Sequence, residues 1–305
     1  MGGGGGSDFS PSSRTTARRI DKLIEIERQR LETDINNYLE VLLSEFNKRD
    51  SDQDRKRLDQ LRDCLGDDVE VEDLLLGGSV AKHTAVDGIS DVDALVVLDR
   101  VDVRGKSPSK VLEVLRSILN KALHRKDVKS IEKGDLAVTV TYTDGREIQL
   151  LPAVRAGKNV KISDATGAAW KEIRSKQFAG RLTKANEGTN GALVPSIKLM
   201  KAINDSLPAQ KKMSGYHIEA LAVDAMKEYT GPKSVKAVFE RVLEHSASRV
   251  MRPIQDVTGQ SRTVDDYLGP AKGSSRQIVS QGLASIRRRL GAATSVSDWK
   301  SILEG

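Results

Sequence analysis

The first regular pattern along the chain is a set of apolar residues at helical spacing between Arg19 and Lys48. They recur every three or four positions, which places them on one face of a helix. The residues of that face are Ile20, Leu23, Ile24, Leu31, Ile35, Leu39, Leu42 and Phe46. The pattern predicts one long amphipathic helix that packs along the protein as a spine. A helix lying on a membrane surface is the alternative, and the acidic residues on its polar face count against it.

Two later segments, residues 53–64 and 109–123, also have helical spacing, and apolar runs between them predict strands. Residues 74–76 are a short apolar run that ends in two glycines. Residues 93–98 are almost continuously apolar, which is typical of a strand buried on both faces. These runs predict part of a small mixed sheet.

A hairpin is predicted after the second of these helices. Residues 136–143 alternate between apolar and polar side chains, and residues 147–151 follow the pair Asp144-Gly145. Two β-prone runs on either side of Asp-Gly are a strong hairpin signal. Pro152 is expected to end the second strand, because proline cannot donate a backbone hydrogen bond.

The rest of the chain is predicted to be a loop-rich stretch followed by helices. These helices cover residues 193–204, 214–229, 235–245, 276–290 and 296–303. The order of elements predicts an α+β fold in two parts. We expect a catalytic core with the spine helix at residues 17–155 and a helical, substrate-binding lobe at residues 156–305. Residues 1–16 are rich in Gly and Ser and are expected to be disordered.

Composition narrows the class of protein without selecting a function. The 305 residues are 38% apolar and 30% charged, as in soluble globular proteins. The net charge of +6 tolerates an anionic ligand, so a nucleic-acid partner is only weakly supported. The single cysteine, Cys64, excludes an internal disulfide and a thiolate zinc cluster. No apolar run is long enough for a membrane span and no signal peptide is recognisable, so we expect a cytoplasmic protein without a membrane partner.

The candidate chemistry lies at Asp91-Val92-Asp93, at the head of the apolar strand. Residues two apart on a strand point to the same side, so both carboxylates project from one edge. Two neighbouring carboxylates repel each other unless a cation lies between them. Oxygen ligands at this spacing suit Mg²⁺, with Mn²⁺ as the alternative. In a two-metal site, one ion activates the attacking hydroxyl and the other stabilises the leaving pyrophosphate.

A glycine-rich turn upstream of the aspartates is a candidate phosphate site. The glycines of Gly77-Gly78-Ser79 let the backbone approach a phosphate, and the turn is expected to open a helix whose N–H groups favour anions. The Ser79 hydroxyl adds a hydrogen bond, and Lys82 adds a positive charge one turn further on. Most such turns and most strand-edge Asp pairs bind nothing, but their combination beside an apolar strand predicts a nucleotide site.

The segments Gly78–Thr84 and Ser90–Leu95 resemble the signature of the polymerase-β-like nucleotidyltransferases. Within that superfamily the chain is similar to the group of cyclic GMP-AMP synthase, 2′-5′-oligoadenylate synthases and archaeal CCA-adding enzymes. It is most similar to the bacterial CD-NTases, the cyclic-oligonucleotide synthases of CBASS anti-phage defence. The resemblance implies a nucleotidyltransferase core with a mixed sheet, a long N-terminal spine helix and a C-terminal helical lobe.

Two further motifs extend the resemblance into the C-terminal half. Pro195–Lys201 resembles the family's helix that offers lysines to the triphosphate, and Ser214–Leu221 matches the start of the next core helix. The nucleotide ligands that the resemblance implies are Gly78, Ser79, Lys82, Lys198, Lys201, Ser214 and Tyr216. Of the two helix lysines, Lys201 is favoured as a phosphate ligand. Tyr216 is either a base-stacking residue or a core tyrosine.

One position departs from the family's pattern. Residues 150–153 resemble the strand that carries a third carboxylate, but Gln149 stands where relatives have Asp or Glu. Glutamine offers a carbonyl oxygen and no charge. Glu147 lies two residues earlier on the same strand face and substitutes only if the strand shifts. Three interpretations stay open: a slower enzyme, altered acceptor chemistry, or nucleotide binding without turnover.

The sequence therefore predicts a metal-dependent nucleotidyltransferase in which Asp91 and Asp93 are the catalytic metal ligands. A ribose or deoxyribose hydroxyl attacks the α-phosphate of an NTP and pyrophosphate leaves. By resemblance, the product is a cyclic or short linear oligonucleotide that a downstream effector protein binds. One alternative is another template-independent polymerase or a CCA-type tRNA nucleotidyltransferase. The other is a non-catalytic sensor of nucleotides or nucleic acids, which rests on Gln149.

Overall fold

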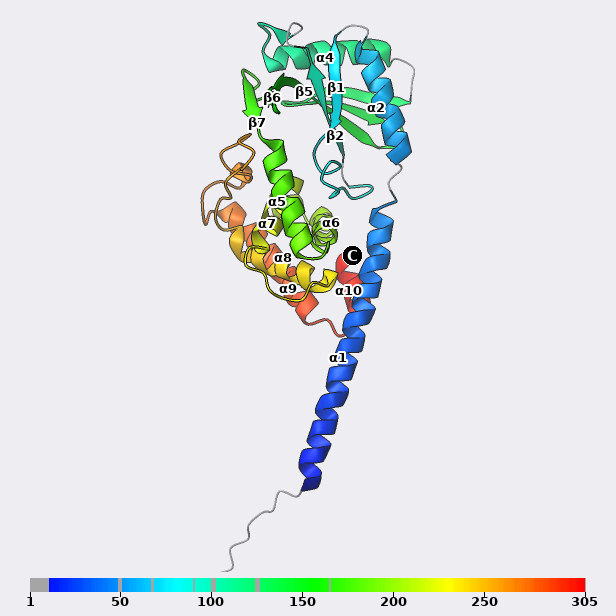
Figure 1. Ribbon diagram of the computed structural model, residues 1–305, viewed down its shortest axis with the longest axis vertical. Helices are drawn as coiled ribbons and strands as arrows, with labels where there is room; N and C mark the ends of the chain where they lie inside the picture. The colour runs from blue at the N-terminus through cyan, green and yellow to red at the C-terminus, as the bar shows by residue number, and fades with distance from the viewer. Residues whose placement is uncertain are drawn as a thin grey trace, which may run out of the picture.

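A computed structural model gives the fold, and it describes residues 11–48, 51–66, 69–89, 91–99, 103–123, 127–164 and 166–304. The chain forms two parts, a sheet with helices on one face and a bundle of helices (Figure 1). Each part has its own hydrophobic core. The mixed α+β architecture that the sequence predicts is confirmed.

The sheet has the strand order β1-β2-β5-β4-β3, with β6 paired to β5 and β7 paired to β6. The strands are β1 (Val71–Leu76), β2 (Val92–Leu98), β3 (Val128–Lys133), β4 (Val138–Tyr142), β5 (Glu147–Ala156), β6 (Asn159–Ser163) and β7 (Trp170–Ile173). The central pair, β2 and β5, is parallel, and its register sets Asp93 beside Gln149. The other pairings are antiparallel.

Two helices cover one face of the sheet, and this decides where the aspartates point. Helices α2 (Ser51–Gly66) and α4 (Pro108–Ala122) share a core with Val92, Ala94 and Val96 of β2. Successive side chains of a strand alternate between its two faces. Asp93 therefore lies on the opposite face, toward the helical part.

The helical part follows the sheet in the sequence. Its helices are α5 (Ser175–Gly188), α6 (Leu193–Ser206), α7 (Gly215–Ala225), α8 (Val235–Arg249), α9 (Ser274–Gly291) and α10 (Val296–Leu303), with single turns η1 (Ala209–Lys211) and η2 (Asp266–Leu268). Ser214, Ser234 and Ser295 cap α7, α8 and α10, each accepting a backbone N–H three residues on. Such caps satisfy donors that a helix start leaves unpaired.

The predicted spine is helix α1 (Pro11–Phe46), but only its C-terminal half packs on the protein. Ile35, Leu39, Leu42 and Leu43 are buried in the core of the helical part. Side chains 16–30 are exposed, and this half of the rod extends away from the body in Figure 1. Among the described helices, none is long and apolar enough to cross a membrane.

Both domain limits expected from the sequence differ from the observed packing. Residues 1–10 of the expected tail lie outside the described residues, but residues 11–16 are helical, because proline is well suited to a first helical position. The spine helix packs with the helical part and not with the sheet. The sheet continues past residue 155 to Ile173, since β6 and β7 extend it. Both are short strands with few apolar residues, and their periodicity is correspondingly weak.

The expectation that Pro152 ends its strand is wrong. Strand β5 continues to Ala156, and Pro152 lies beside Val96 of β2. On the other side of β5, pairing with β4 stops at Leu150 and pairing with β6 starts at Ala153. Pro152 occupies the gap between these partners, where one edge of β5 needs no hydrogen-bond donor. The Asp144-Gly145 hairpin is confirmed, and Gly145 has the positive φ of 85° that such turns require.

Candidate active site

A cavity of about 350 Å³ lies between the sheet and the helical part. Seven of the residues predicted for the site line it: Gly78, Ser79, Lys82, Asp91, Asp93, Lys201 and Tyr216. They come from the loop after β1, the head of β2 and helices α6 and α7. Four segments that are far apart in the sequence therefore contribute to one hollow, as a site for a large ligand requires.

The glycine turn lies directly against Asp93. The Gly77 N–H donates to the Asp93 carbonyl oxygen at 2.7 Å. Gly78 has a φ of 51°, and a Cβ added there would lie 1.6 Å from Oδ2 of Asp93. Only glycine therefore lets the carboxylate rest on this turn. The helix expected after the turn is absent; residues 78–83 form successive turns that end at His83, whose φ is 58°.

The two aspartates differ in their surroundings. Burial raises the pKa of Asp93, the charge of Asp91 raises it further, and Lys82 and Lys201 oppose both effects. Asp91 is more exposed and accepts a hydrogen bond of 2.9 Å from Nε2 of Gln149. The glutamine therefore supports one aspartate without adding a third negative charge.

The register of β5 is not shifted, so Glu147 does not take the place of Gln149. Gln149 is the residue beside Asp93, and Glu147 accepts a hydrogen bond of 3.1 Å from the Thr141 hydroxyl. Glu147 and Asp91 line a second, adjoining cavity of about 330 Å³. The structure thus places a glutamine, and not a carboxylate, beside Asp93.

The residues present fit a divalent cation held by two carboxylates. Burial is the main cause of the raised pKa of Asp93, and repulsion by the charge of Asp91, which a cation would relieve, adds to it. Within the described ranges, no group of three His, Cys, Asp or Glu side chains is arranged to hold a metal ion. Asp91 and Asp93 are the two carboxylates of the cavity that would hold such an ion. The remaining ligands would be neutral, such as the Gln149 oxygen or water, or substrate phosphate.

Both lysines at the cavity contact one buried carboxylate that the sequence reasoning missed. Glu219 of α7 has a side chain that is 1% exposed. Its Oε1 accepts from Nζ of Lys201 at 2.9 Å, and its Oε2 lies 2.7 Å from Nζ of Lys82. The signal for it was a single acidic residue inside the apolar run Ile218–Leu221, because a carboxylate buried in a helix core needs a cationic partner.

Lys198 and Ser214 are not brought into the cavity. The Lys198 ammonium instead donates to Oδ1 of Asn47 at 2.5 Å, at the end of α1. Ser214 caps α7, with its hydroxyl accepting the His217 N–H at 3.2 Å. Its neighbour Gly215 does line the cavity. The proposed phosphate contact of Ser214 therefore lies at the margin of the site.

Tyr216 has features of both roles that the sequence left open. One side of the ring lines the cavity, as base stacking would require. The ring also packs edge-on against Phe178 at 4.8 Å between centroids, and its hydroxyl donates to Oδ1 of Asp256 at 2.8 Å. It is therefore a fixed, half-buried wall of the site.

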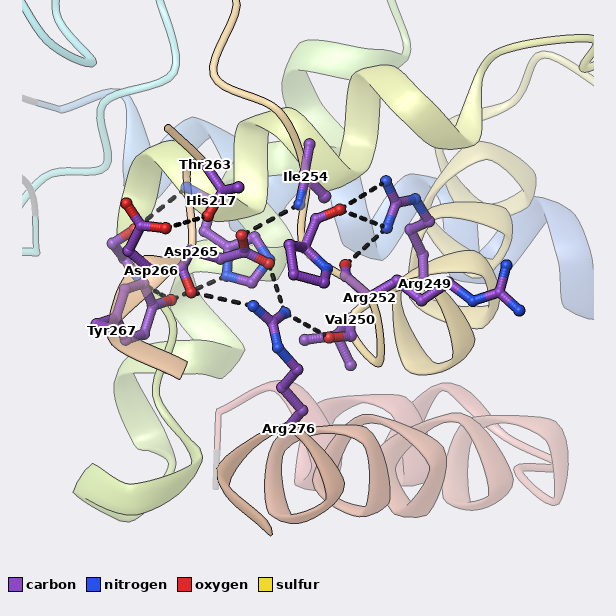
Figure 2. Close-up of polar contacts among 12 residues, drawn as sticks. His217, Arg249, Val250, Arg252, Ile254, Thr263, Asp265, Asp266, Tyr267 and Arg276 are labelled. Atoms are coloured by element: carbon purple, nitrogen blue, oxygen red, sulfur yellow. Dashed lines mark hydrogen bonds and ion pairs between the residues drawn. The ribbon is translucent and has the colours of Figure 1, made fainter. Parts of the chain in front are cut away.

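Behind the start of α7 lies a polar network, drawn in Figure 2, in which His217, Asp265 and Arg276 are buried and Tyr267 is half exposed. The Tyr267 hydroxyl accepts the Ser214 N–H at 3.0 Å and lies 2.9 Å from Nδ1 of His217. Asp265 and Arg276, both without exposed side-chain surface, form an ion pair of 2.6 Å on the far side of the histidine. Burial lowers the pKa of His217 to about 4, so its ring is neutral at pH 7.

With the geometry described, comparison with known proteins assigns the family. Residues 34–186 match the family described as Second Messenger Oligonucleotide or Dinucleotide Synthetase domain. The chain belongs to this family. The matched segment of this synthetase domain runs from α1 into α5 and includes the whole sheet with both aspartates. No curated protein sequence matches the chain.

Solved structures share the fold at low sequence identity. Escherichia coli MS115-1 CdnC, in complex with HORMA-deltaN, has a TM-score of 0.62 at 14% identity, covering 83% of this chain and 90% of its own. Vibrio cholerae DncV cyclic AMP-GMP synthase has 0.60 at 11% identity, with 97% and 90% covered. Elizabethkingia meningoseptica CdnE, with GTP and Apcpp, has 0.57 at 14% identity, with 78% and 92% covered. The resemblance to the bacterial CD-NTases is confirmed, and the protein is a second-messenger nucleotidyltransferase by family.

Proposed function

We propose that the protein is a metal-dependent, template-independent nucleotidyltransferase that makes a cyclic or short linear oligonucleotide from NTPs in the cytoplasm. The product is a signal in anti-phage defence that an effector protein binds. The observation that carries the proposal is the shared cavity, in which Asp91, just before β2, and Asp93, on β2, line the same space as a glycine turn and two lysines. Carboxylates beside phosphate-binding groups are what nucleotidyl transfer needs.

In the proposed reaction, a ribose hydroxyl oxygen bonds to the α-phosphorus of an NTP, and the bond to the β-phosphate oxygen breaks. Asp91 and Asp93 would hold Mg²⁺ or Mn²⁺, which when bound offsets the negative charge of the phosphates. The Gly78 backbone and the Ser79 hydroxyl lie where the triphosphate would enter. The positive charges of the two cavity lysines, Lys82 and Lys201, would stabilise the negative charge of the released pyrophosphate.

Gln149 makes a slow enzyme the preferred form of this proposal. The hydroxyl that attacks must lose a proton, and a third carboxylate would favour that loss through its charge. Gln149 donates to Asp91 instead, which lowers the charge available to the attacking group. Altered acceptor chemistry and binding without turnover remain the outcomes that the test below separates.

Labelled NTPs and dNTPs, with Mg²⁺ or Mn²⁺, test the function directly. The purified protein is compared with an Asp91→Ala/Asp93→Ala double variant, and products are resolved before and after phosphatase treatment. A phosphatase-resistant product that the variant does not make is the expected result. A linear ladder, or a strong preference for tRNA acceptors, would favour the polymerase or CCA-type alternative. Nucleotide binding without any product would favour the sensor.

A further inference from the structure

The N-terminal half of helix α1 leaves the body of the protein as an exposed rod. The side chains of residues 17–30 are exposed, and this half extends away from the helical part in Figure 1. Isolated helices shorter than about 15 residues are marginal in water, because most helical stability in proteins comes from packing an apolar face against a partner. The rod therefore needs a partner surface to stay helical.

The rod carries an apolar stripe that such a partner would cover. Ile20 is 52% exposed and Ile24 is 58% exposed. At roughly 100° per residue, both lie on the same helix face as Leu31, Ile35 and Leu42, which pack in the core of the helical part. The exposed stripe thus continues a face that already serves as a packing surface. Exposed apolar surface of this kind marks an interaction site.

A groove lies where the rod joins the body. It has a volume of about 620 Å³ and is lined by Arg28 and Glu32 of α1 together with residues of α8 and α9. Arg28 follows Ile24 by one helical turn on the same side of α1, so a helix packed along the stripe would reach the groove. The stripe and the groove together form a surface for an elongated, helical partner.

The charges along the rod favour a second copy of this chain as that partner. Residues 16–23 contain three basic residues and one acidic residue, and residues 24–34 contain two basic and four acidic residues. Two copies laid antiparallel would set each positive half against a negative half, whereas a parallel pair would set like charges side by side. The basic residues are Arg18, Arg19, Lys22, Arg28 and Arg30, and the acidic residues are Asp21, Glu25, Glu27, Glu32 and Asp34.

An anionic membrane surface is a poorer match for the stripe. Helices that lie on membranes are rich in Lys and Arg on their polar face. Residues 16–34 instead carry as many acidic as basic side chains, so the segment has no net charge. The same balance counts against a nucleic acid, which attracts an excess of positive charge.

We propose that the projecting half of α1 is a dimerisation arm, which pairs antiparallel with the same helix of a second copy. The twofold axis passes beside Ile24, so the two Ile24 side chains pack on each other. Asp21 of each copy then lies almost opposite Arg28 of the other, and the end of each arm enters the groove of the other copy. The arm contains no residue of the nucleotide cavity, so the proposal is independent of the proposed function.

Sedimentation velocity of the full chain at micromolar concentrations measures the dimer. Ile24→Glu removes two isoleucines from the interface and sets two carboxylates together, so it should weaken the dimer about a hundredfold or more. Ile26→Glu is the matched control, since Ile26 is 51% exposed on the same rod and points about 160° away from Ile24. It should change the dissociation constant by less than about threefold. A general loss of helix would affect both variants alike.

Cysteine cross-linking tests the orientation of the two arms. The background is Cys64→Ser, which removes the single native thiol. Ile24→Cys should form a disulfide between copies under mild oxidation, because a residue at the twofold axis faces itself. Ile20→Cys should not, because an antiparallel pair separates the two copies of that position by about 12 Å along the helix axes. A parallel pair would cross-link at both positions.

Charge reversal gives a second measure of the same orientation. Asp21→Arg should weaken the dimer several-fold, and adding Arg28→Asp should restore it, because the pair is then only exchanged. A monomer at every concentration overturns the proposal, as does a dimer that Ile24→Glu leaves intact or equal cross-linking at both cysteine positions. A monomer that binds anionic lipid vesicles, and loses this binding in Ile24→Glu, would assign the stripe to a membrane instead. None of these measurements needs turnover, so their failure would leave the proposed function untouched.

Discussion

Two buried carboxylates, Glu219 and Asp265, show how the same group serves different ends in one helical part. Asp265 is matched to Arg276 at 2.6 Å and accepts the Ile254 N–H at 3.1 Å, away from the cavity. Glu219 is shared by two lysines and faces the cavity. The Asp265 pair is electrically balanced by itself, whereas the two lysines at Glu219 also interact electrostatically with Asp93 of β2. The first arrangement stabilises the fold away from the cavity, and the second connects the helical part with the aspartates of the sheet.

Removing one partner from each carboxylate should give the largest contrast. Arg276→Met leaves Asp265 charged, buried and unpaired, and should lower the free energy of unfolding by about 3–5 kcal/mol. Lys82→Met leaves Glu219 paired with Lys201 and should cost well under half of that. Urea unfolding followed by circular dichroism measures both. As a control, Arg287→Met removes the exposed ion pair with Glu244 and should cost less than about 1 kcal/mol. Equal losses in the free energy of unfolding for Arg276→Met and Lys82→Met would contradict the expected difference between the two carboxylates.

The histidine beside the balanced pair should make folding sensitive to acid. Burial lowers the pKa of His217 to about 4, with Asp265 opposing the shift and Arg276 and Arg249 adding to it. Its ordinary pKa is 6.5, so between pH 6.5 and 4 the unfolded chain binds a proton that the folded protein excludes. This contribution is fully present above pH 6.5 and falls away toward pH 4, by roughly 3 kcal/mol.

The pH dependence of urea unfolding between pH 7 and 4 measures this effect. His217→Gln removes the titrating group and should flatten the profile over the same range, although other carboxylates still titrate near its acidic end. An unchanged slope in that variant would mean that His217 is not the group excluded from protonation.

Whether a feature of this fold could be predicted from the sequence depends on how far apart in the chain the residues that form it lie. Strand β2, with Asp93 in it and Asp91 just before it, was predicted, because alternation and the apolar run are local signals. The helices of the second half from α6 on were predicted for the same reason, but α5 (Ser175–Gly188) was missed, because it lies in the stretch that was expected to be loop-rich. Strands β3, β6 and β7 were missed, since each contains only two apolar residues, too few to establish a period. Lys201 and Glu219 are separated by 18 residues, and Lys201 and Thr84 by 117. Contacts at such separations are set by tertiary packing, which a single sequence does not display.

Gln149, beside Asp93, allows a test of how the charge near the aspartates affects activity. Gln149→Asp would add the third carboxylate beside Asp93, where the register already aligns the two strands. It should raise product formation about tenfold at limiting Mg²⁺ and lower the Mg²⁺ concentration for half-maximal rate, because an added anionic ligand strengthens the metal site. Gln149→Asn is the control, with the same shortening and no charge. Slower product formation by Gln149→Asp would mean that the glutamine is suited to a different acceptor.

The smallest effect is expected at the start of α7, where the Asp265–Arg276 network adjoins the cavity. Tyr267→Phe removes the hydroxyl that accepts the Ser214 N–H and is hydrogen-bonded to Nδ1 of His217, and should cost about 1 kcal/mol of stability. Because Ser214 adjoins Gly215 in the cavity wall, KM for NTP should also rise a few-fold while kcat changes little. Tyr229→Phe is the matched control, since its hydroxyl donates to the Pro232 carbonyl in an exposed loop and should change neither. If Tyr267→Phe lowers the stability but leaves KM unchanged, the network around His217 and Asp265 stabilises the fold and does not affect nucleotide binding in the cavity.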